Sequence, residues 1–457
     1  MNKVSIDAPR EMAVKILYDI DKNGAYSNIS LGKHLDSRNF KDIDRAFITE
    51  LVYGILKWKL TIDYIISRFS RVKLKKISPW ILNILRIGVY QIIFTDKVPV
   101  SAACNESVKL AKRYGHAASS KYVNGVLRNI SRDKERIKYP DKKDNLSEFL
   151  SVSYSHPLWM IDEWIKRYGE EFTEELLKNN NQTPHFTIRT NTLKTSKTHL
   201  KKILEEEGFE VDYGQYMEEA LIIKNPKSLQ EMDAFKKGYF QVQDESSMLV
   251  ASVLNPEPND FVLDVCSAPG GKTTHLAQLM DNKGTIVARD IHEHKIQLIS
   301  QAAKRLGIDI IKTEIFDATL FDEKLEEKAD KVLVDAPCTG LGIIRRKPDI
   351  KWTRKKEDKN EIVKLQKKIL STSSKYVRKG GIIVYSTCTI EPEENQYVIE
   401  EFLDNNKDFY LEDAWGNLPE TIKDLPKVFN EKKEYIQLYP NKHGVDGFFI
   451  AKLKKRS

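Results

Sequence analysis

The sequence predicts a multidomain protein with an all-α domain, a small α+β module and a doubly wound, Rossmann-like α/β domain, in that order. Three observations lead to this prediction. The chain of 457 residues is too long for one ordinary domain. Apolar residues recur at helical spacing through the first third, and apolar strand-like runs alternate with helical segments from about residue 245 onward. We expect the domains over residues 1–135, 151–240 and 241–457, with a linker over 136–150.

Helical periodicity dominates the N-terminal domain. Between residues 10 and 22, the apolar side chains that share one helix face are Met12, Ala13, Ile16, Leu17 and Ile20. The same spacing predicts helices over 43–58, 61–69, 79–94, 101–114 and 118–130. Pro79 can occupy a first helical turn, and Pro99 interrupts the chain between two of these helices. Because no strand-like alternation is present, we expect a compact all-α domain.

The middle of the chain mixes both kinds of secondary structure. Residues 133–150 are polar and charged and contain Pro140, which predicts a linker. After it we expect helices over 158–180 and 197–207, and short strands over 186–191, 220–223 and 238–243. This combination predicts a small α+β module.

The last part of the chain has the pattern of a mostly parallel sheet covered by helices. The expected strands cover 261–266, 285–290, 311–317, 331–337 and 380–388. One expected helix begins at Gly271, and three further helices are expected over 293–306, 357–378 and 394–404. Two closing runs, EYIQLYP and GFFIAKL, follow each other closely and predict an antiparallel hairpin. Ligands of such sheets bind beyond the carboxyl ends of the strands, so we expect the site there.

Basic residues are concentrated in the N-terminal part of the chain. Residues 1–140 contain 26 Lys and Arg against 13 Asp and Glu, whereas the remainder contains 48 against 53. The formal net charge of +8 therefore hides a strongly basic domain on a mildly acidic body. This asymmetry indicates a polyanionic partner, with nucleic acid ahead of a membrane surface. A solvated charged face is the alternative.

The spacing of the cysteines and the length of the apolar runs argue against a metal-binding, a secreted and a membrane-spanning protein. The four cysteines are far apart and form no metal-ligand spacing, so we expect no metal. Free thiols are typical of a reduced compartment, and the N-terminal residues show no secretory signal, so we expect a cytoplasmic protein. No apolar run approaches the roughly 20 residues that a membrane span needs.

The segment Asp264–Lys272 joins an expected strand to a helix through small residues. Gly270 and Gly271 allow close backbone approach, and the helix N-terminus offers free N–H groups. A phosphate-binding P-loop fits poorly, because Cys266 stands at its first glycine position and Pro269 removes an N–H group. A Rossmann dinucleotide loop would need G-x-G-x-x-G, which is absent. A loop for a methyl donor without phosphate fits these residues, and a tight turn without a ligand is the remaining alternative.

Acidic residues stand at the carboxyl ends of the next two expected strands. Asp290 lies 19 residues beyond Gly271, where a carboxylate can bind both hydroxyls of a ribose. Asp317 could reach an adenine edge, or it could cap the segment that follows it. Together with the preceding loop, Asp290 predicts a cofactor that contains a nucleoside.

Two cysteines also stand where strands end. Cys338 belongs to the run Asp335–Ala336–Pro337–Cys338, and Cys388 follows Tyr385–Ser386–Thr387. Two of the four cysteines thus fall at the edge where the cofactor is expected. A thiolate there could act as a nucleophile, whereas two small buried side chains are the alternative. A P-loop enzyme would instead use Asp335 as a magnesium ligand.

The motifs CSAPGGK, VARD, DAPCTGLGIIRRKPDIKW and YSTCT, with FQVQDESS upstream, resemble those of the RNA (cytosine-5) methyltransferases. The helical N-terminus resembles a NusB-type RNA-binding domain, and the combination is similar to family members that act on bacterial 16S ribosomal RNA. The resemblance covers nearly the whole chain. It implies a class I methyltransferase domain, S-adenosyl-L-methionine as cofactor and 16S ribosomal RNA as partner. We expect the protein to be a monomer.

The resemblance also implies roles for individual residues. Those implied to bind the cofactor are Cys266, Ser267, Ala268, Pro269, Gly270, Gly271, Lys272, Asp290, Asp317 and Asp335. Cys388 is implied to be the nucleophile and Cys338 to assist product release, while Asp335 also touches the base. The residues alone do not order the two cysteines. At three positions the sequence departs from the residues that are commoner in the family, and none of these departures removes a functional group: Ser267, Arg289 and Thr389.

The chemistry explains why such an enzyme needs a cysteine. Carbon 5 of cytosine is a poor nucleophile toward a sulfonium methyl group. Addition of a thiolate at carbon 6 makes carbon 5 nucleophilic and divides one difficult step into two. Asp335 could bond the N3–N4 edge of the base and favour the protonated ring.

Further residues and other functions stay open at this point. Basic residues that could hold RNA phosphates, or form a solvated loop, are Arg345, Arg346, Lys347 and Lys351. Arg189 and Asn191 could face the RNA or the active site. The alternative functions are a cytosine-5 methyltransferase for tRNA or another RNA, a P-loop nucleotidase, and a non-catalytic NusB-like RNA-binding or antitermination factor.

Overall fold

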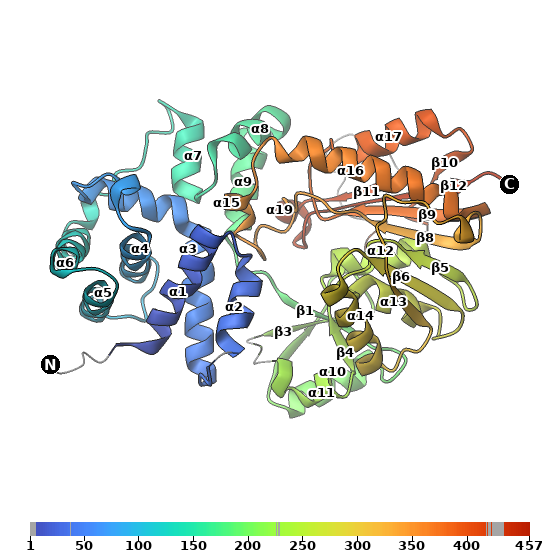
Figure 1. Ribbon diagram of the computed structural model, residues 1–457, viewed down its shortest axis with the longest axis horizontal. Coiled ribbons are helices and arrows are strands. Elements are labelled where there is room, and N and C mark those ends of the chain that lie inside the picture. Colours follow the sequence, from blue (N-terminus) through green and yellow to red (C-terminus); the bar gives the residue numbers. More distant parts are fainter. Residues whose placement is uncertain are drawn as a thin grey trace. The chain divides into compact units, whose positions relative to one another are not determined.

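A computed structural model gives the fold of the chain and describes residues 6–36, 38–224, 226, 229–416, 418, 422 and 434–457. The chain divides into two compact units (Figure 1). The helical unit contains Met1–Gln182 and Ile344–Lys356, and the α/β unit contains Thr183–Ile343 and Glu357–Ser457. Within the described residues, no helix is long and apolar enough to cross a membrane.

The described part of the helical unit is built from helices. They are α1 (Ala8–Asn23), α2 (Ser27–Asp36), α3 (Asp42–Phe69), η1 (Leu74–Lys76), α4 (Pro79–Ile93), α5 (Val100–Tyr114), α6 (Ala117–Arg132), η2 (Lys134–Arg136), α7 (Leu146–Tyr154), α8 (Leu158–Tyr168), α9 (Glu170–Asn180) and α15 (Ile350–Thr353). Buried aliphatic side chains such as Ile16, Leu51, Ile84 and Leu127 form its core. This arrangement confirms the predicted all-α domain.

Local sequence determines several helix ends. The Asp7 side chain accepts a hydrogen bond from the Arg10 N–H group at the start of α1. Pro79 holds the first position of α4. The helices expected over 43–58 and 61–69 form one helix, α3, with a kink at Trp58 (φ −107°, ψ 17°). The break in periodicity therefore marks a kink and not a loop.

The helical unit extends further along the chain than the sequence predicts. α7 begins inside the expected linker, and α8 and α9 were expected as one helix of the α+β module. Gly169, with a φ of 82°, separates α8 from α9. Leu150, Trp164 and Leu176 are buried, and α7 contacts α3, α8 and α9. Burial of these apolar side chains outweighs the polar composition around Pro140.

A segment from far along the chain completes the helical unit. Trp352 of α15 donates from Nε1 to the Leu56 carbonyl of α3 at 2.7 Å. Asp349 accepts a hydrogen bond from Ser27 Oγ at 2.6 Å. In Figure 1, α15 is drawn in orange among the blue and green helices. Residues 344–356 therefore belong structurally to the helical unit, although they directly follow a loop of the α/β unit.

The α/β unit begins with a small antiparallel sheet. β1 (Phe186–Thr190), β2 (Glu210–Tyr213), β3 (Ala220–Lys224) and β4 (Phe240–Val242) pair in the order β2-β3-β1-β4. The module also contains α10 (Lys197–Glu206), η3 (Leu229–Glu231) and α11 (Asp233–Lys236). β1, β3 and β4 match the predicted runs. β2 escapes prediction because Val211 is its one buried side chain.

A larger sheet carries the main architecture of the α/β unit. Its strands are β5 (Phe261–Asp264), β6 (Thr285–Asp290), β7 (Ile311–Ile315), β8 (Ala329–Asp335), β9 (Val377–Thr387), β10 (Phe409–Glu412), β11 (Tyr435–Leu438) and β12 (Phe448–Lys455). They pair in the order β10-β12-β9-β8-β5-β6-β7, and β11 also pairs with β12. The helical elements are α12 (Glu245–Leu254), α13 (Gly271–Leu279), α14 (Glu293–Leu306), η4 (Glu323–Leu325), α16 (Asp358–Ser373), η5 (Ser374–Tyr376), α17 (Gln396–Asn405) and α19 (Pro440–His443).

This topology confirms the doubly wound sheet and its closing hairpin. β5 to β9 are joined by parallel pairings, and β11 and β12 are antiparallel partners, with Ile436 opposite Ile450. α12 and β10 are elements that the sequence does not predict. Parallel strands end at one edge of a sheet, so the loops after β5, β6, β8 and β9 meet there.

Candidate active site

The loop after β5 forms the first part of the site. Gly270 has a φ of 98°, and a Cβ atom there would approach the Ile299 backbone to 3.2 Å, so the position favours glycine. Ser267 is buried and donates from its N–H group and its Oγ to the Arg289 carbonyl, each at 2.9 Å. A Cβ atom at Gly271 would meet nothing nearer than 4.0 Å. The N-terminus of α13 is therefore open to a ligand.

The remaining loop residues differ in exposure. Cys266 and Ala268 are half-buried, and Pro269 is exposed. Burial raises the pKa of the Cys266 thiol well above its ordinary value, and the Asp264 carboxylate adds to this effect. Cys266 is therefore a neutral thiol, which can line a cofactor site but is a poor nucleophile.

Asp264 is a candidate ligand-binding residue that sequence reasoning did not single out. It is buried at the end of β5, and its Oδ2 accepts a hydrogen bond from Thr273 Oγ1 at 2.7 Å. Its Oδ1 has no hydrogen-bond partner among the described residues. Burial raises the pKa of this carboxyl to about 7. An unsatisfied buried oxygen is costly, and a ligand that donates a hydrogen bond would satisfy it.

Asp290 is the last residue of β6, and Asp317 lies two residues beyond β7, so both are at strand ends as predicted. Asp290 is buried, and its Oδ1 accepts the N–H group of His292 at 3.1 Å. Asp317 is half-buried, and its Oδ1 accepts both the N–H group of Thr319 at 2.9 Å and its hydroxyl at 2.8 Å. Asp317 therefore stabilises its own turn through one carboxylate oxygen, which is the capping role that the sequence left open.

Asp335 connects three elements of the site. At the end of β8, its Oδ2 accepts a hydrogen bond from Lys272 Nζ at 2.6 Å. Its Oδ1 accepts one from Ser386 Oγ at 2.8 Å. Lys272 belongs to the first turn of α13 and Ser386 to β9, so one carboxylate links the cofactor loop to both strands that precede the cysteines.

The two cysteines of the site are in contact. Cys338 Sγ lies 3.2 Å from Cys388 Sγ, and both residues are half-buried. β8 and β9 are parallel neighbours with Asp335 opposite Ser386, which places the two following loops side by side. The Gly342 N–H group donates to the Cys388 carbonyl at 3.0 Å and ties the loops together. Tertiary pairing thus converts two distant motifs into one thiol pair.

The contact between the two thiols affects the ionisation of Cys338. The contact with Cys388 raises the pKa of Cys338 well above its ordinary value, and burial adds to the increase. Cys338 therefore keeps its proton. A protonated thiol at Cys338 can donate a hydrogen bond to the neighbouring sulfur of Cys388.

Arg189 and Asn191 are buried supports of the module and not exposed RNA ligands. Arg189 donates from Nη1 to the Gly271 carbonyl at 2.8 Å, and burial lowers its pKa to about 9. Asn191 donates from Nδ2 to the carbonyls of Gly238 and Leu306, each at 2.9 Å. Arg189 thus supports the first turn of α13, the helix that follows the loop after β5.

The basic segment after Cys338 differs from the expectation of an exposed phosphate-binding loop. Lys351 is buried, and its Nζ donates to the Lys57 carbonyl at 2.7 Å within the helical unit. Arg345 is also buried. The expectation is therefore wrong for Lys351, which packing in the helical unit encloses, and Arg345 is not an exposed side chain either. Arg346 is half-buried and Lys347 is exposed, and their role stays a prediction.

Residues after Cys388 form a polar network that sequence reasoning missed. Asn395 accepts the Thr387 hydroxyl at 2.6 Å and donates to the Thr389 carbonyl at 3.1 Å. Glu394 is buried and contacts both cysteine loops. The available signal was the run EPEEN, which begins three residues beyond Cys388, because acidic side chains rarely follow a buried strand without a partner.

Family models match the three parts of the chain. The NusB family matches residues 7–132. A ferredoxin-like domain of RsmF/B-like methyltransferases matches residues 156–230, and the 16S rRNA methyltransferase RsmB/F family matches residues 251–454. These matches confirm the predicted order of a NusB-like helical domain, a small α+β module and a Rossmann-like methyltransferase domain.

Full-length relatives agree with the family models. The chain is 39% identical to the probable ribosomal RNA small subunit methyltransferase B of Bacillus subtilis (strain 168), over 100% of both chains. It is 31% identical to the ribosomal RNA small subunit methyltransferase B of Shewanella oneidensis, over 98% of this chain and 99% of the relative. A crystal structure described as that of PH0851 superimposes with a TM-score of 0.80 at 30% identity, covering 99% of this chain and 100% of that one. The chain therefore belongs to the 16S rRNA methyltransferase RsmB/F family.

Proposed function

We propose that the protein transfers a methyl group from S-adenosylmethionine to carbon 5 of a cytosine in 16S ribosomal RNA, through a covalent adduct with Cys388. The observation that carries this proposal is the contact between Cys338 and Cys388, 3.2 Å apart beside Asp335. Methylation of an exocyclic nitrogen or a ribose hydroxyl has no use for two adjacent thiols. Activation of carbon 5 needs one thiol for attack, and a second can serve the later elimination.

The residues present fit S-adenosylmethionine. The unsatisfied Asp264 Oδ1 can accept from the ammonium group of its methionine part, and Asp290 can accept from its ribose hydroxyls. The open N-terminus of α13 can face its carboxylate. When bound, S-adenosylmethionine supplies an electrophilic methyl group.

In the proposed reaction, Cys388 attacks first. Its thiolate forms a bond to carbon 6 of the cytosine, and the electron pair of the C5–C6 bond becomes available at carbon 5 to take the methyl group. Asp335 holds the N3–N4 edge, where a proton on N3 offsets the developing charge. Because Asp335 already accepts from Lys272 and Ser386, it is pre-oriented for this hydrogen bond.

Release of the product reverses the adduct. The proton on carbon 5 passes to a water molecule, the C–H electron pair re-forms the C5–C6 double bond, and the bond from carbon 6 to the Cys388 sulfur breaks with its electron pair on sulfur. Cys338, held as a thiol beside Cys388, is placed to donate a proton to the departing sulfur. The target base must leave its stack to reach this site, so an unpaired region or a junction is the expected substrate.

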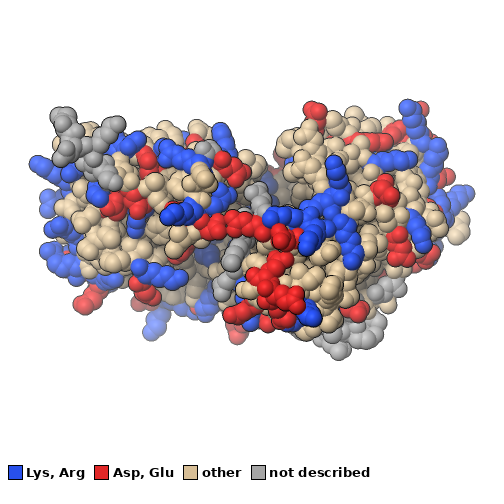
Figure 2. Space-filling view, turned by 90° about the horizontal axis from the view of Figure 1, so that it is seen from below, with Lys and Arg blue, Asp and Glu red and all other residues tan. Residues whose placement is uncertain are grey.

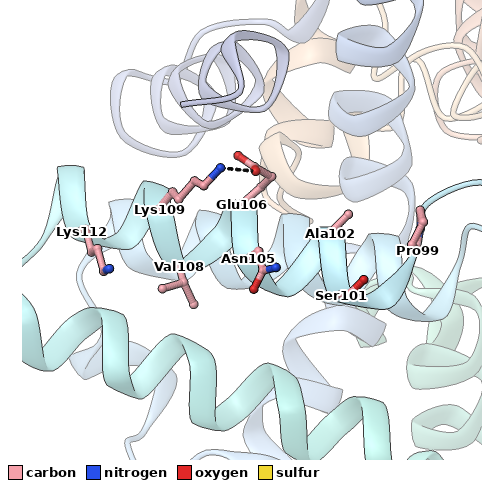
Figure 3. Close-up of a pocket in the computed structure, with 8 residues that line it drawn as sticks. All are labelled: Pro99, Ser101, Ala102, Asn105, Glu106, Val108, Lys109 and Lys112. Carbon is pink, nitrogen blue, oxygen red and sulfur yellow. Dashed lines mark hydrogen bonds and ion pairs between the residues drawn. The ribbon is translucent and has the colours of Figure 1, made fainter. Parts of the chain in front are cut away.

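The helical unit is proposed to bind the RNA. Lys and Arg side chains gather at the left-hand end of Figure 2, over this unit. A hollow of about 530 Å³ lies along α5, and its lining combines the apolar Pro99, Ala102 and Val108 with Ser101, Asn105, Glu106, Lys109 and Lys112 (Figure 3). Lys112 is exposed, and Lys109 pairs with Glu106 at 2.7 Å. The relatives named as small-subunit ribosomal RNA methyltransferases match along the whole chain, which supports 16S ribosomal RNA as the substrate.

Bisulfite sequencing of total RNA tests the proposed function. In a strain that lacks the gene, we expect one 16S cytosine to become sensitive to bisulfite conversion, and the wild-type gene to restore its resistance. The gene for Cys388→Ala should not restore it. If the change appears in tRNA and 16S RNA is unaffected, the substrate is wrong, and if no cytosine changes, the reaction is wrong. Calorimetric titration with S-adenosylmethionine and with ATP separates a methyltransferase from a nucleotidase.

A further inference from the structure

Glu394 is a buried carboxylate that the proposed chemistry does not use. It lies in the loop between β9 and α17, and its side chain is fully enclosed. Its Oε2 accepts the N–H group of Thr339 at 2.8 Å, and its Oε1 accepts the Thr339 hydroxyl at 2.5 Å. Thr339 directly follows Cys338. Glu394 therefore holds the Cys338 loop through two hydrogen bonds.

The same carboxylate reaches the loop of the other cysteine. Thr389 directly follows Cys388, and its Oγ1 donates to Glu394 Oε1 at 3.4 Å. The hydroxyls of Thr389 and Thr339 lie 3.0 Å apart. Glu394 and the two threonines thus form one polar cluster between the residues that follow the two cysteines.

Two neighbours hold Glu394 in place. Gln366 of α16 donates from Nε2 to Glu394 Oε2 at 3.1 Å and to the Pro337 carbonyl at 2.9 Å. The Tyr385 hydroxyl donates to the backbone carbonyl of Glu394 at 2.7 Å. The position of the carboxylate is therefore determined from α16 and from β9, and its position in turn determines where both loops lie.

The burial of a carboxylate here has a free-energy cost that several donors offset. Burial raises the pKa of Glu394, and the hydrogen bonds from Thr339 and Gln366 oppose that increase. The charge of Glu394 also contributes to the raised pKa of Cys338, after the larger effects of Cys388 and burial. An apolar residue could fill the space without the desolvation cost. The carboxylate thus has an effect on Cys338 that an apolar residue would lack.

We infer that Glu394 is a positioning residue for the reaction, which holds the two cysteine loops in contact and keeps Cys338 as a thiol while Cys388 attacks the base. The inference rests on the proposed function, because it assumes distinct roles for the two cysteines. Glu394 acts through Thr339 and Cys338 and has no contact with the substrate in this scheme.

The first test separates the hydrogen bonds of Glu394 from its charge. Glu394→Ala removes both. Glu394→Gln keeps an oxygen for the Thr339 N–H group and adds an amide that can donate to the Thr339 hydroxyl. The matched control is Glu391→Gln, a buried carboxylate of the same loop that pairs with Lys359 at 2.6 Å. All variants are compared at equal amounts of folded protein, below their melting temperatures.

We expect Glu394→Ala to lower kcat by about 100-fold, the scale of a misplaced catalytic group, with the KM for S-adenosylmethionine unchanged. Glu394→Gln should recover most of that loss, and Glu391→Gln should retain the wild-type kcat. If Glu394→Ala does not fold, Thr339→Val tests the same bridge, because it removes the hydroxyl and keeps the side-chain shape.

The second test measures the charge effect at Cys338. In a Cys388→Ala background, alkylation of Cys338 by iodoacetamide is followed against pH, and peptide mass spectrometry distinguishes it from the other cysteines. The titratable groups that interact electrostatically with Cys338 then include Glu394 and Tyr385. Loss of a nearby negative charge favours the thiolate. We expect the midpoint of alkylation to fall in Glu394→Gln and to stay unchanged in Glu391→Gln.

RNA that contains 5-fluorocytosine keeps failure of the inference apart from failure of the proposed function. Fluorine at carbon 5 cannot leave as the proton does, so the adduct with Cys388 persists. If the wild-type protein forms no such adduct, the proposed function is wrong. If it does, but Glu394→Ala has the kcat of the Glu391→Gln control or Glu394→Gln leaves the alkylation midpoint unchanged, the inference is overturned.

Discussion

Lys272 Nζ lies 2.6 Å from Asp335 Oδ2, so the first turn of α13 and the strand before Cys338 share one ion pair. The Lys272 ammonium also lies 4.9 Å from the centroid of the Phe448 ring on β12. The pair is largely shielded from solvent, which strengthens it relative to a surface pair. It orients the carboxylate that is proposed to hold the cytosine.

Replacement of Lys272 by Met keeps the aliphatic stem and removes the charge. We expect kcat/KM for methyl transfer to fall by the equivalent of about 1.5–3 kcal/mol, the range for a hydrogen bond to a charged group. The measurement is transfer of labelled methyl groups from S-adenosylmethionine to 16S RNA. Lys295→Met is the control, since Lys295 lies 3.8 Å from Asp290 and is more exposed. Equal effects of both substitutions would show that the ion pair with Asp335 has no special role.

Asp290→Ala should weaken binding of S-adenosylmethionine by about 1.5–3 kcal/mol, because two ribose hydroxyls would lose a charged acceptor. Calorimetric titration of the folded variant measures this directly. Asp309→Ala removes an exposed carboxylate of the same unit and should leave the affinity unchanged. Unaltered affinity in Asp290→Ala would remove Asp290 from the ribose site.

Alanine variants of the two cysteines should fail in different ways. Cys388→Ala should be inactive and form no covalent RNA adduct, while it still binds cofactor and RNA. Cys338→Ala should attack and methylate but release slowly, so a protein–RNA species that resists denaturation should accumulate. Denaturing gels with RNA and S-adenosylmethionine distinguish these results. An adduct in Cys388→Ala and none in Cys338→Ala would reverse the assignment, and full activity in both would exclude covalent catalysis.

Trp352 should stabilise the helical unit although it comes from a distant part of the sequence. Its indole donates to the Leu56 carbonyl and packs against the core of that unit. We expect Trp352→Ala to lower the free energy of unfolding by about 2–3 kcal/mol, less than for a fully buried Trp because Trp352 is half-buried. Hydrogen exchange of α3 provides a local readout. Lys347→Ala, an exposed position of the same segment, should leave exchange unchanged, and equal exchange in both variants would contradict the prediction.

Lys109 and Lys112 should contribute to RNA affinity in the full-length protein. Replacing both by Ala should weaken binding and reduce the salt dependence of the binding constant by about 0.7–0.9 for each phosphate group that the variant no longer neutralises. Filter binding at several salt concentrations measures the slope. Lys379→Ala is a control from the α/β unit. An unchanged slope in the double variant would show that the hollow on α5 lies outside the RNA path.

The sequence by itself determined the features that depend on short stretches of chain. These features are the helical periodicity, the apolar runs of the strands and the strand–loop–helix motifs around Gly270 and Asp290. Each of them depends only on residues within one or two helical turns or within one strand. The closing hairpin was predictable for the same reason. The family resemblance rests on motif residues, and each motif is a short contiguous segment at the end of one strand. Such segments can be recognised without knowledge of the tertiary structure.

The tertiary structure decided every relationship between segments distant in the chain. Pairing of β8 with β9 brings Cys338 and Cys388 into contact, and no periodicity in either segment specifies that register. Packing around α3 encloses Lys351 and draws residues 344–356 into the helical unit, whereas the sequence had suggested a loop that binds RNA phosphates or is solvated. Glu394 acquires its place because a backbone N–H group, hydroxyls and a side-chain amide that lie apart in the sequence all donate to its carboxylate. Burial and hydrogen-bond partners depend on the whole fold, so composition and spacing could not reveal them.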